Sequence, residues 1–241
     1  ATRVTTAKDM RLRAELIAAK NESGDAGKFE ALVKKIMDQS DAALILMSES
    51  ADALKAALQI AATRVPLIYA ATDANTDAMV ALAKEFKCPL VARAANLDAL
   101  TALTDKLGAA GIKDIVLDGG ARTVRGAFEE QVFVRRAALT QKNRSLGFST
   151  IAFPCEMTDD PMKEALIAAT MVAKYAGIIV LSDFQGESLF PLLVARLNIY
   201  TDPQRPMMMQ QGIYPVGNPT ADSPVLITTN FALTYFIVSG E

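Results

Sequence analysis

Seven short apolar runs, each followed by a helical pattern, recur along the first 200 residues of the chain. Each run is nearly continuous in Ile, Leu, Val and Ala, which is typical of parallel strands that are covered on both faces. The runs are RAELIAAK (13–20), ALILMSE (43–49), PLIYAA (66–71), PLVARA (89–94), DIVLDGG (114–120), STIAFPC (149–155) and GIIVLSD (177–183). Alternation of strand and helix at this spacing of about 27 residues predicts right-handed crossovers and a wholly parallel sheet.

Residues suited to helix starts follow several of these runs. Asn96 precedes the helical pattern LDALTALTDKLGAAG, Thr123 precedes VRGAFEEQVFVRRAA, and Asp159 or Asp160 precedes PMKEALIAATMVAKY, where Pro161 suits a first helical turn. Seven consecutive units fit a TIM-type (β/α)8 barrel, which typically has about 250 residues, better than an open doubly wound sheet of roughly six strands. The sequence therefore predicts an α/β barrel.

The two ends of the chain do not fit a complete barrel. Residues 1–12 supply no buried strand and helix for an eighth unit, and half of the chain's 10 prolines lie in the stretch 203–224. Such a stretch predicts an extended linker. The pattern VLITTN then predicts a strand and FALTYFIVSGE a helix, too little to fold alone. We expect a barrel domain over 1–202 that lacks its first strand, a linker over 203–224, and the start of a further α/β domain over 225–241.

The composition excludes several classes of site. The chain has no histidine, which excludes a Ser-His-Asp system, a His-based zinc site and histidine acid–base catalysis within it. Cys88 and Cys155 lie far apart without a CxxC partner and indicate reduced core residues of a cytoplasmic protein. The net charge is −2, with scattered cations, and neither a signal peptide nor a membrane span is apparent. We therefore expect no nucleic-acid or membrane partner.

Polar residues follow the apolar runs at the edge where α/β barrels place their active sites. They are Lys20, Asn21, Glu22, Ser48, Glu49, Thr72, Asp73, Arg93, Asp118, Cys155, Glu156, Ser182 and Asp183. Asp118 or Asp183 as an acid–base group, with Arg93 or Lys20 holding an anion, is one interpretation of this edge. The other is that loops there simply meet water.

The stretch DGGARTVRG (118–126) offers backbone N–H groups and two arginines, which suits a phosphate. It lacks both the GxxxxGK[ST] and the GxGxxG pattern, and it does not follow an eighth strand. A tight turn between strand and helix explains the stretch equally well.

Several longer motifs resemble one family. They are KNESGD (20–25), PLIYAAT (66–72), KDIVLDGGARTV (113–124), AKYAGIIVLSD (173–183), NIYTDPQRP (198–206), GIYPVGNP (212–219) and SPVLITTNFALTYF (223–236). From Met10 to Glu241 the chain resembles the large (gamma) subunit of the corrinoid iron–sulfur protein, whose archaeal counterpart is the gamma subunit of the acetyl-CoA decarbonylase/synthase complex.

The resemblance implies an iron–sulfur domain, a central TIM barrel and a Rossmann-like, corrinoid-binding α/β domain. It implies a methyltransferase component that carries methyl on the cobalt of a corrinoid (cobalamin), from a methyl-tetrahydropterin donor to the nickel cluster of acetyl-CoA synthase in the reductive acetyl-CoA (Wood–Ljungdahl) pathway. The implied partners are a small corrinoid-protein subunit in a heterodimer, a methyltetrahydropterin-dependent methyltransferase, and acetyl-CoA synthase with carbon monoxide dehydrogenase. The family's cysteine cluster has no match here, so we expect the [4Fe-4S] centre outside this chain.

The resemblance makes the terminal stretch the first strand and helix of the corrinoid domain. We expect five residues to line one side of the corrinoid, with no catalytic side chain and no metal ligand in this chain. These residues are Thr228, Thr229, Asn230, Phe231 and Thr234. Two alternatives stay open. One is a pterin-binding barrel methyltransferase that uses Asn21 and Asp118, and the other is a structural barrel that scaffolds a heterodimer.

Overall fold

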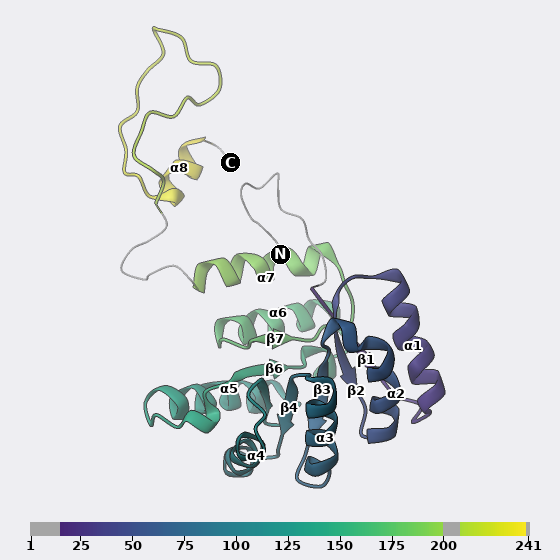
Figure 1. Ribbon diagram of the computed structural model, residues 1–241. Helices are drawn as coiled ribbons and strands as arrows, with labels where there is room; N and C mark the ends of the chain where they lie inside the picture. Colours follow the sequence, from purple (N-terminus) through teal and green to yellow (C-terminus); the bar gives the residue numbers. More distant parts are fainter. Residues whose placement is uncertain (1–14, 200–207, 240–241) are drawn as a thin grey trace. The chain divides into compact units, whose positions relative to one another are not determined.

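A computed structural model describes residues 15–199 and 208–239 (Figure 1). The chain divides into two compact units, Ala1–Leu192 and Leu193–Glu241, with the division inside helix α7 (Gly186–Ile199). The predicted boundary near residue 202 stays a prediction.

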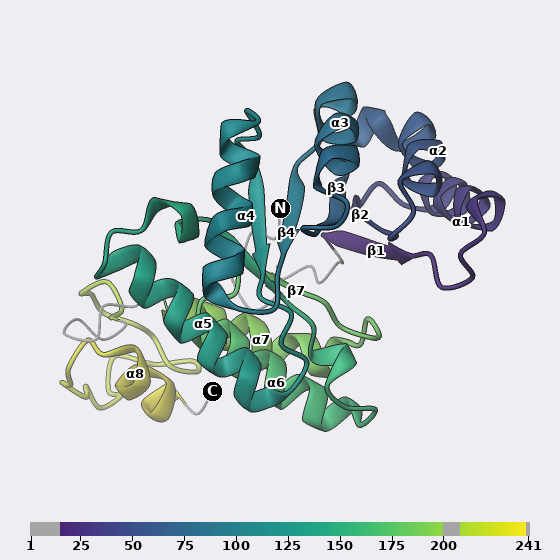
Figure 2. The same cartoon turned by 90° about the horizontal axis from the view of Figure 1, so that it is seen from below.

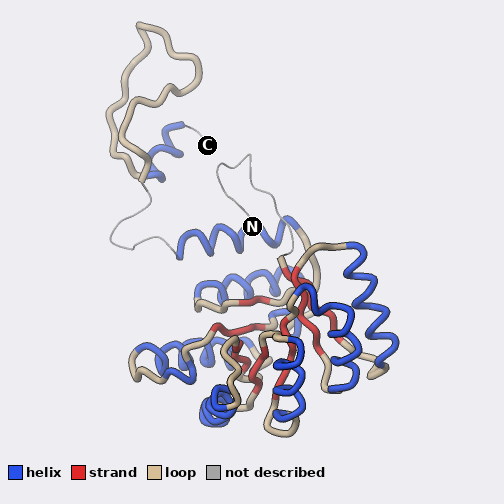
Figure 3. The backbone as a smooth tube through the Cα atoms, in the orientation of Figure 1, coloured by secondary structure: helices blue, strands red, loops and turns tan. Residues whose placement is uncertain are grey.

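Seven parallel strands form one sheet in strict chain order, from β1 at one edge to β7 at the other. Figure 3 shows the strands in red, with the helices in blue around them. They are β1 (Leu16–Lys20), β2 (Ala43–Met47), β3 (Leu67–Ala71), β4 (Leu90–Arg93), β5 (Ile115–Asp118), β6 (Ser149–Ala152) and β7 (Ile178–Ile179). The sheet curls, and α1 to α6 lie along its outer side, as Figures 1 and 2 show. This arrangement confirms the predicted fold class.

The helices that cover the sheet follow each strand in turn. They are α1 (Ala26–Gln39), α2 (Ala51–Ala61), α3 (Thr76–Phe86), α4 (Leu97–Ala109), α5 (Val124–Leu139) and α6 (Pro161–Ala173), with short 3-10 turns η1 (Ala62–Arg64), η2 (Arg144–Leu146) and η3 (Pro154–Glu156). The expected helix starts are confirmed, since Asn96, Thr123 and Asp160 each accept a hydrogen bond from a backbone N–H of the first turn.

The strands bury both of their faces, which explains their unbroken apolar sequences. Leu44 and Leu46 of β2 join a core cluster that also contains helix residues such as Phe29 and Leu54. The alternate residue Ile45 joins a second cluster, whose buried members come from the strands and from Phe153. Because successive side chains of a strand point to opposite faces, the first cluster lies under the helices and the second lies on the inner side of the curl.

The strand predicted over VLITTN is wrong in this structure. Residues 225–230 form no strand, and the nearest pairing is one isolated antiparallel bridge between Met208 and Phe231. Val225 and Ile227 are 86% and 91% exposed, so no described segment lies beside them to complete a ladder.

One expectation about the same region, the helix, is confirmed, whereas the extended linker over 203–224 stays a prediction. The helix after this stretch forms as α8 (Ala232–Ser239). The described part of the proline-rich stretch, 208–224, contains no helix, whereas 203–207 lies outside the described residues. None of the helices in the described part of the chain is long and apolar enough to cross a bilayer.

Candidate functional site

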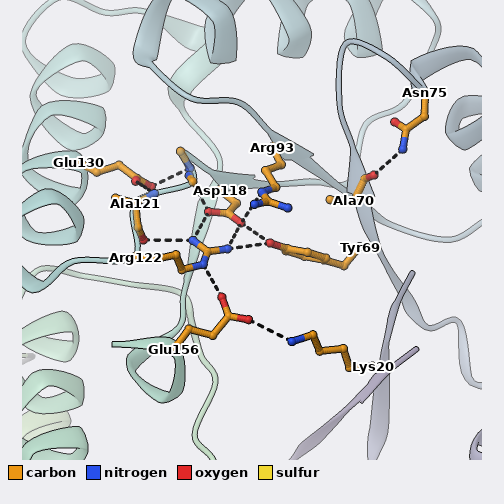
Figure 4. A network of polar contacts seen from close by, with 12 residues as sticks. Lys20, Tyr69, Ala70, Asn75, Arg93, Asp118, Ala121, Arg122, Glu130 and Glu156 are labelled. Carbon is orange, nitrogen blue, oxygen red and sulfur yellow. Dashed lines mark hydrogen bonds and ion pairs between the residues drawn. The ribbon is translucent and has the colours of Figure 1, made fainter. Parts of the chain in front are cut away.

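Asp118, the last residue of β5, is the centre of a polar network at the carboxyl end of the sheet (Figure 4). Its side chain is 1% exposed. The Tyr69 hydroxyl donates to Oδ2 at 2.5 Å, and Arg122 donates to Oδ1 at 3.1 Å and to Oδ2 at 2.9 Å. The Gly120 N–H also donates to Oδ1, at 2.8 Å. Both carboxylate oxygens are therefore occupied by donors from the protein itself.

The chain after β5 turns back sharply, and this turn brings Arg122 onto Asp118. Gly120 has φ +81°, and a Cβ there would lie 3.1 Å from the Ala94 carbonyl oxygen, so the turn requires glycine. The Arg122 guanidinium lies 4.4 Å from the centroid of the Phe153 ring. Such packing holds the guanidinium plane over an apolar surface while its edge binds the carboxylate.

Ion pairs extend the network from Arg122 across to β1. Arg122 Nε donates to Glu156 of η3 at 2.5 Å, and Lys20 of β1 lies 3.6 Å from the other oxygen of Glu156. Arg93 of β4 approaches Asp118 Oδ2 at 4.0 Å. The structure thus brings Lys20, Arg93 and Asp118 together, as predicted for residues at strand ends.

The network fixes the charge of its central groups. Burial alone would raise the pKa of Asp118, but the hydrogen bonds and positive charge of Arg122 hold it below its usual value. Burial together with the charge of Asp118 raises the pKa of Tyr69. Asp118 is therefore a paired carboxylate and Tyr69 a neutral phenol at neutral pH. Neither group is poised for proton transfer.

The contacts of residues 118–121 favour the tight-turn interpretation of the stretch 118–126 over the phosphate interpretation. Glu130 of α5 accepts hydrogen bonds from the N–H groups of Gly119 at 2.8 Å and Ala121 at 3.3 Å, while Asp118 takes that of Gly120. Burial raises the pKa of Glu130 above its ordinary value. Three successive N–H groups of the loop, those of 119–121, therefore already serve protein carboxylates and are not available to a phosphate.

Two other residues predicted at this edge have different surroundings. Asn21 donates from Nδ2 to the Ser48 hydroxyl at 3.2 Å. Asp183 accepts from the Phe184 N–H at 2.7 Å and from the Gln185 amide at 3.0 Å. No hydrogen bond or ion pair among the described residues joins Asp183 to Asp118, and it lies instead in a small pocket. That pocket is lined by Pro161, Glu164, Ala165, Leu181, Ser182, Asp183, Gln185 and Ser188.

The predicted corrinoid-binding residues lie around the start of α8. The hydroxyls of Thr229 and Thr234 are 3.0 Å apart, and the Asn230 amide donates to the Met209 carbonyl at 3.3 Å. Thr228 is exposed and Phe231 is 42% exposed. The structure brings two of the five, Thr229 and Thr234, into direct contact. Their role stays a prediction.

The two cysteines lie at opposite ends of the sheet. Cys88 precedes β4, whereas Cys155 follows β6 within η3. Within the part of the chain that the structure describes, no group of three or more His, Cys, Asp or Glu side chains could hold a metal ion. The residues present therefore do not fit an iron–sulfur cluster.

Three members of the network, Tyr69, Phe153 and Glu130, were not among the predicted site residues, and Arg122 was considered only as one of two arginines that suit a phosphate. Tyr69 carried a signal, since it is a hydroxyl-bearing aromatic inside an otherwise aliphatic buried run. Arg122 carried a weaker signal, because it lies four residues after Asp118, a carboxylate at the end of a strand. Glu130 belongs to an exposed-looking helix pattern, and only the curl of the loop brings it inward.

Comparison with known families gives one match over nearly the whole chain. Residues 3–241 match the family described as the CO dehydrogenase/acetyl-CoA synthase delta subunit. The corrinoid/iron-sulfur protein large subunit of Moorella thermoacetica is 41% identical over 227 residues, which cover 94% of this chain and 50% of that protein. The acetyl-CoA decarbonylase/synthase complex subunit gamma of Archaeoglobus fulgidus is 34% identical over 235 residues, covering 93% and 50%. The chain spans about half the length of the curated relatives it matches.

Solved structures confirm the fold. The 7,8-dihydropteroate synthase of Vibrio fischeri gives a TM-score of 0.57 at 13% identity, covering 78% of this chain and 82% of that one. The Yersinia pestis DHPS gives a TM-score of 0.54 at 16% identity, covering 77% and 83%. At such low identity the likeness shows the fold alone.

Proposed function

We propose a function from a single premise, that the chain belongs to the family of the CO dehydrogenase/acetyl-CoA synthase delta subunit. We propose that it is part of a methyl-carrier subunit, which accepts a methyl group from a methyl-tetrahydropterin donor and passes it to the nickel cluster of acetyl-CoA synthase. The observation that carries this proposal is 41% identity to a corrinoid/iron-sulfur protein large subunit over 94% of the chain.

The barrel network supports a carrier rather than a barrel enzyme. A catalytic acid or base must be free to exchange a proton with a substrate. Asp118 instead binds Tyr69 and Arg122, and its pKa lies below the usual value. In a corrinoid protein the reaction belongs to the cofactor, while the protein binds and orients it. The pterin-binding alternative requires Asp118 to be free to contact the pterin, but its carboxylate is already bonded within the protein.

The terminal stretch fits a corrinoid in its chemistry. Residues 223–240 contain no charged side chain, and three exposed apolar residues, 225–227, are followed there by the hydroxyl and amide groups of 228–230. A corrinoid has apolar ring faces and an amide periphery, and its cobalt, when bound, supplies the centre that carries the methyl group. We propose that Thr228, Thr229, Asn230, Phe231 and Thr234 line one side of it. One loop and one helix cover only a small part of so large a ligand, so we expect the remaining contacts to come from elsewhere in the full protein and its partner.

The same proposal assigns the iron–sulfur centre to a part of the protein other than these 241 residues, because Cys88 and Cys155 cannot meet. It also assigns the protein to the cytoplasm. The proposed partners are the small corrinoid-protein subunit, the pterin-dependent methyltransferase, and acetyl-CoA synthase with carbon monoxide dehydrogenase.

Methyl transfer tests the proposed function directly. The full-length protein with its small subunit and cobalamin, first reduced to Co(I) by an added chemical reductant, should show the visible spectrum of methyl–cobalt after incubation with the methyltransferase and its methyl-tetrahydropterin. Absence of this spectrum in a complex that holds cobalamin would refute the proposal.

A matched pair of variants tests the site residues. Thr229→Val with Thr234→Val removes two hydroxyls at nearly constant volume, and we expect cobalamin affinity to fall about tenfold, or about 1.4 kcal/mol. Thr63→Val, an exposed position in η1, should leave it unchanged. Equal affinities in all three proteins would contradict the site and not the function.

A further inference from the structure

The cations of the barrel are unevenly distributed along the sequence. Between Gln131 and Cys155 there are four cations and no Asp or Glu, although the whole chain has 25 cations and 27 acids. These cations are Arg135, Arg136, Lys142 and Arg144. Lys174, just after α6, also lies in a stretch without acids, 165–182.

The fold gathers the four cations between 131 and 155 near the end of α5, whereas Lys174 lies over Phe128, nearer the start of that helix. The Gln141 N–H donates to the Arg136 carbonyl at 3.3 Å, and the Asn143 N–H donates to the Ala137 carbonyl at 3.0 Å. The segment with Lys142 therefore folds back beside the last turn of α5. The four cations between 131 and 155 are exposed, and no ion pair joins any of them to an acid in the described ranges. The dipole of α5 favours a cation in its last turn, but it does not account for the cations beyond it.

Apolar side chains lie among the cations. Tyr175 is 52% exposed, with the Arg135 guanidinium 3.8 Å from its ring centroid, and Leu139 is 65% exposed. The Lys174 ammonium lies 4.8 Å from the Phe128 ring centroid. In the described part of the barrel, α1 to α4 expose one large apolar side chain, whereas α5 and α6 expose six. Figure 2 shows α5 and α6 side by side on the outside of the sheet. We call the surface of Arg135, Arg136, Leu139, Lys142, Arg144, Lys174 and Tyr175 the α5–α6 basic face.

We propose that the α5–α6 basic face binds an acidic surface with an apolar centre on another protein subunit of the complex. The inference rests on the proposed function, because it requires that the chain works within such a complex. The face carries five cations, and Asp105 of α4, which accepts from the Ser145 hydroxyl beside Arg144, offsets only one of them. The face is therefore positive although the chain has a net charge of −2, and it favours an acidic partner. Arg and Tyr, which the face presents together at Arg135 and Tyr175, are residues that interface centres favour.

The same contacts disfavour nucleic acid as the occupant. Binding to single strands uses exposed aromatic faces on which bases stack. Here Arg135 lies over one face of the Tyr175 ring and Lys174 lies over one face of the Phe128 ring, so one stacking face of each ring is already occupied. A folded protein surface needs no such stacking platform.

Charge reversal tests the proposal, with a matched control on the same barrel. The full-length protein with Arg135→Glu and Arg136→Glu is compared with Lys34→Glu and Lys35→Glu, which make the same charge change at exposed positions of α1. Binding to the purified partner subunits is measured by calorimetry at low and high salt. We expect the α5 variant to bind about tenfold more weakly at low salt and to lose most of the salt dependence. The α1 variant should stay within about twofold of the unmodified protein.

A second variant removes the apolar contact without changing charge. Leu139→Ser, at an exposed position, should leave the circular dichroism spectrum unchanged and weaken binding several-fold. Equal binding by the α5 and α1 variants would overturn the proposed face alone, whereas failure of the unmodified protein to bind any subunit would overturn the proposed function with it. Loss of self-association only, or of polynucleotide binding only, in the α5 variant would likewise overturn the proposal.

Discussion

Replacing Asp118 by Asn tests whether the ion network stabilises the barrel. The substitution keeps the size of the side chain and one oxygen that accepts from the Gly120 N–H. It removes the negative charge that faces Arg122. It also places an amide NH2 group, which can only donate, opposite N–H donors whose hydrogen bonds the carboxylate had accepted. Arg122 then retains hydrogen bonds to Glu156 and Tyr69 but loses its main counter-ion.

The size of the effect follows from burial. Breaking a buried ion pair by removing one partner costs about 3–5 kcal/mol, because the other charge stays uncompensated. Arg122 is 23% exposed and keeps Glu156, so we expect the lower end, about 3 kcal/mol of the free energy of unfolding. With a urea slope of about 2 kcal/mol/M, the unfolding midpoint should fall by about 1.5 M.

Urea unfolding followed by circular dichroism measures this shift. The control is Asp73→Asn at the same edge of the sheet, where the side chain is exposed and has no hydrogen bond to any described residue. We expect that change to stay within about 0.5 kcal/mol of the unmodified protein. Tyr69→Phe, which leaves the ion pair intact, should cost about 1 kcal/mol. If Asp118→Asn lowers the midpoint no more than the control, the network contributes nothing to stability and the reasoning from burial fails.

Three further outcomes follow from the same contacts. Because the folded pKa of Asp118 lies below its usual value of about 3.9, its contribution is complete above that pH and is lost as the pH falls through the folded pKa. Acidification should therefore destabilise the unmodified protein more than Asp118→Asn, and parallel pH profiles would contradict this. Burial, together with the charges of Glu156 and Glu164, raises the pKa of the Cys155 thiol to about 11. Alkylation of this thiol at about pH 8 should therefore be about 100-fold slower than alkylation of glutathione. Unfolding in urea should remove the difference. Glu164 is 6% exposed and accepts hydrogen bonds from the Ser182 N–H at 2.7 Å and from the Ser182 hydroxyl at 2.5 Å. Glu164→Gln should lower the free energy of unfolding in urea by about 1–3 kcal/mol, and an unchanged urea midpoint would refute this.

The sequence predicts the barrel well because its signal is local. Each strand is a short apolar run, and each cap residue, such as Asn96 or Thr123, satisfies a backbone donor only a few residues away. The strand ends also predict which polar residues share an edge, since parallel strands in chain order must bring Lys20, Arg93 and Asp118 to one side. No knowledge of side-chain conformation is needed for either inference.

The pairing within the site could not be predicted in this way. Asp118 is an acid–base candidate by position, but its role depends on Tyr69, which lies 49 residues away and contacts it only because β3 and β5 curl toward each other. Glu130 reaches the Gly119 N–H because the glycine turn folds under α5. Such long-range contacts carry no local pattern, and they decide whether a carboxylate is free or paired.

The stretch 225–231 shows the opposite limit, a clear local signal with no tertiary partner. Its β-branched and apolar residues favour a strand, yet an isolated strand gains no ladder hydrogen bonds and buries no surface. Val225 and Ile227 are accordingly almost fully exposed, which is costly for large apolar side chains in water. In the proposed carrier we expect a surface of the full protein to cover these side chains. We propose that this surface is the corrinoid with the residues around it, which joins the strand-like sequence and the proposed cofactor in one explanation.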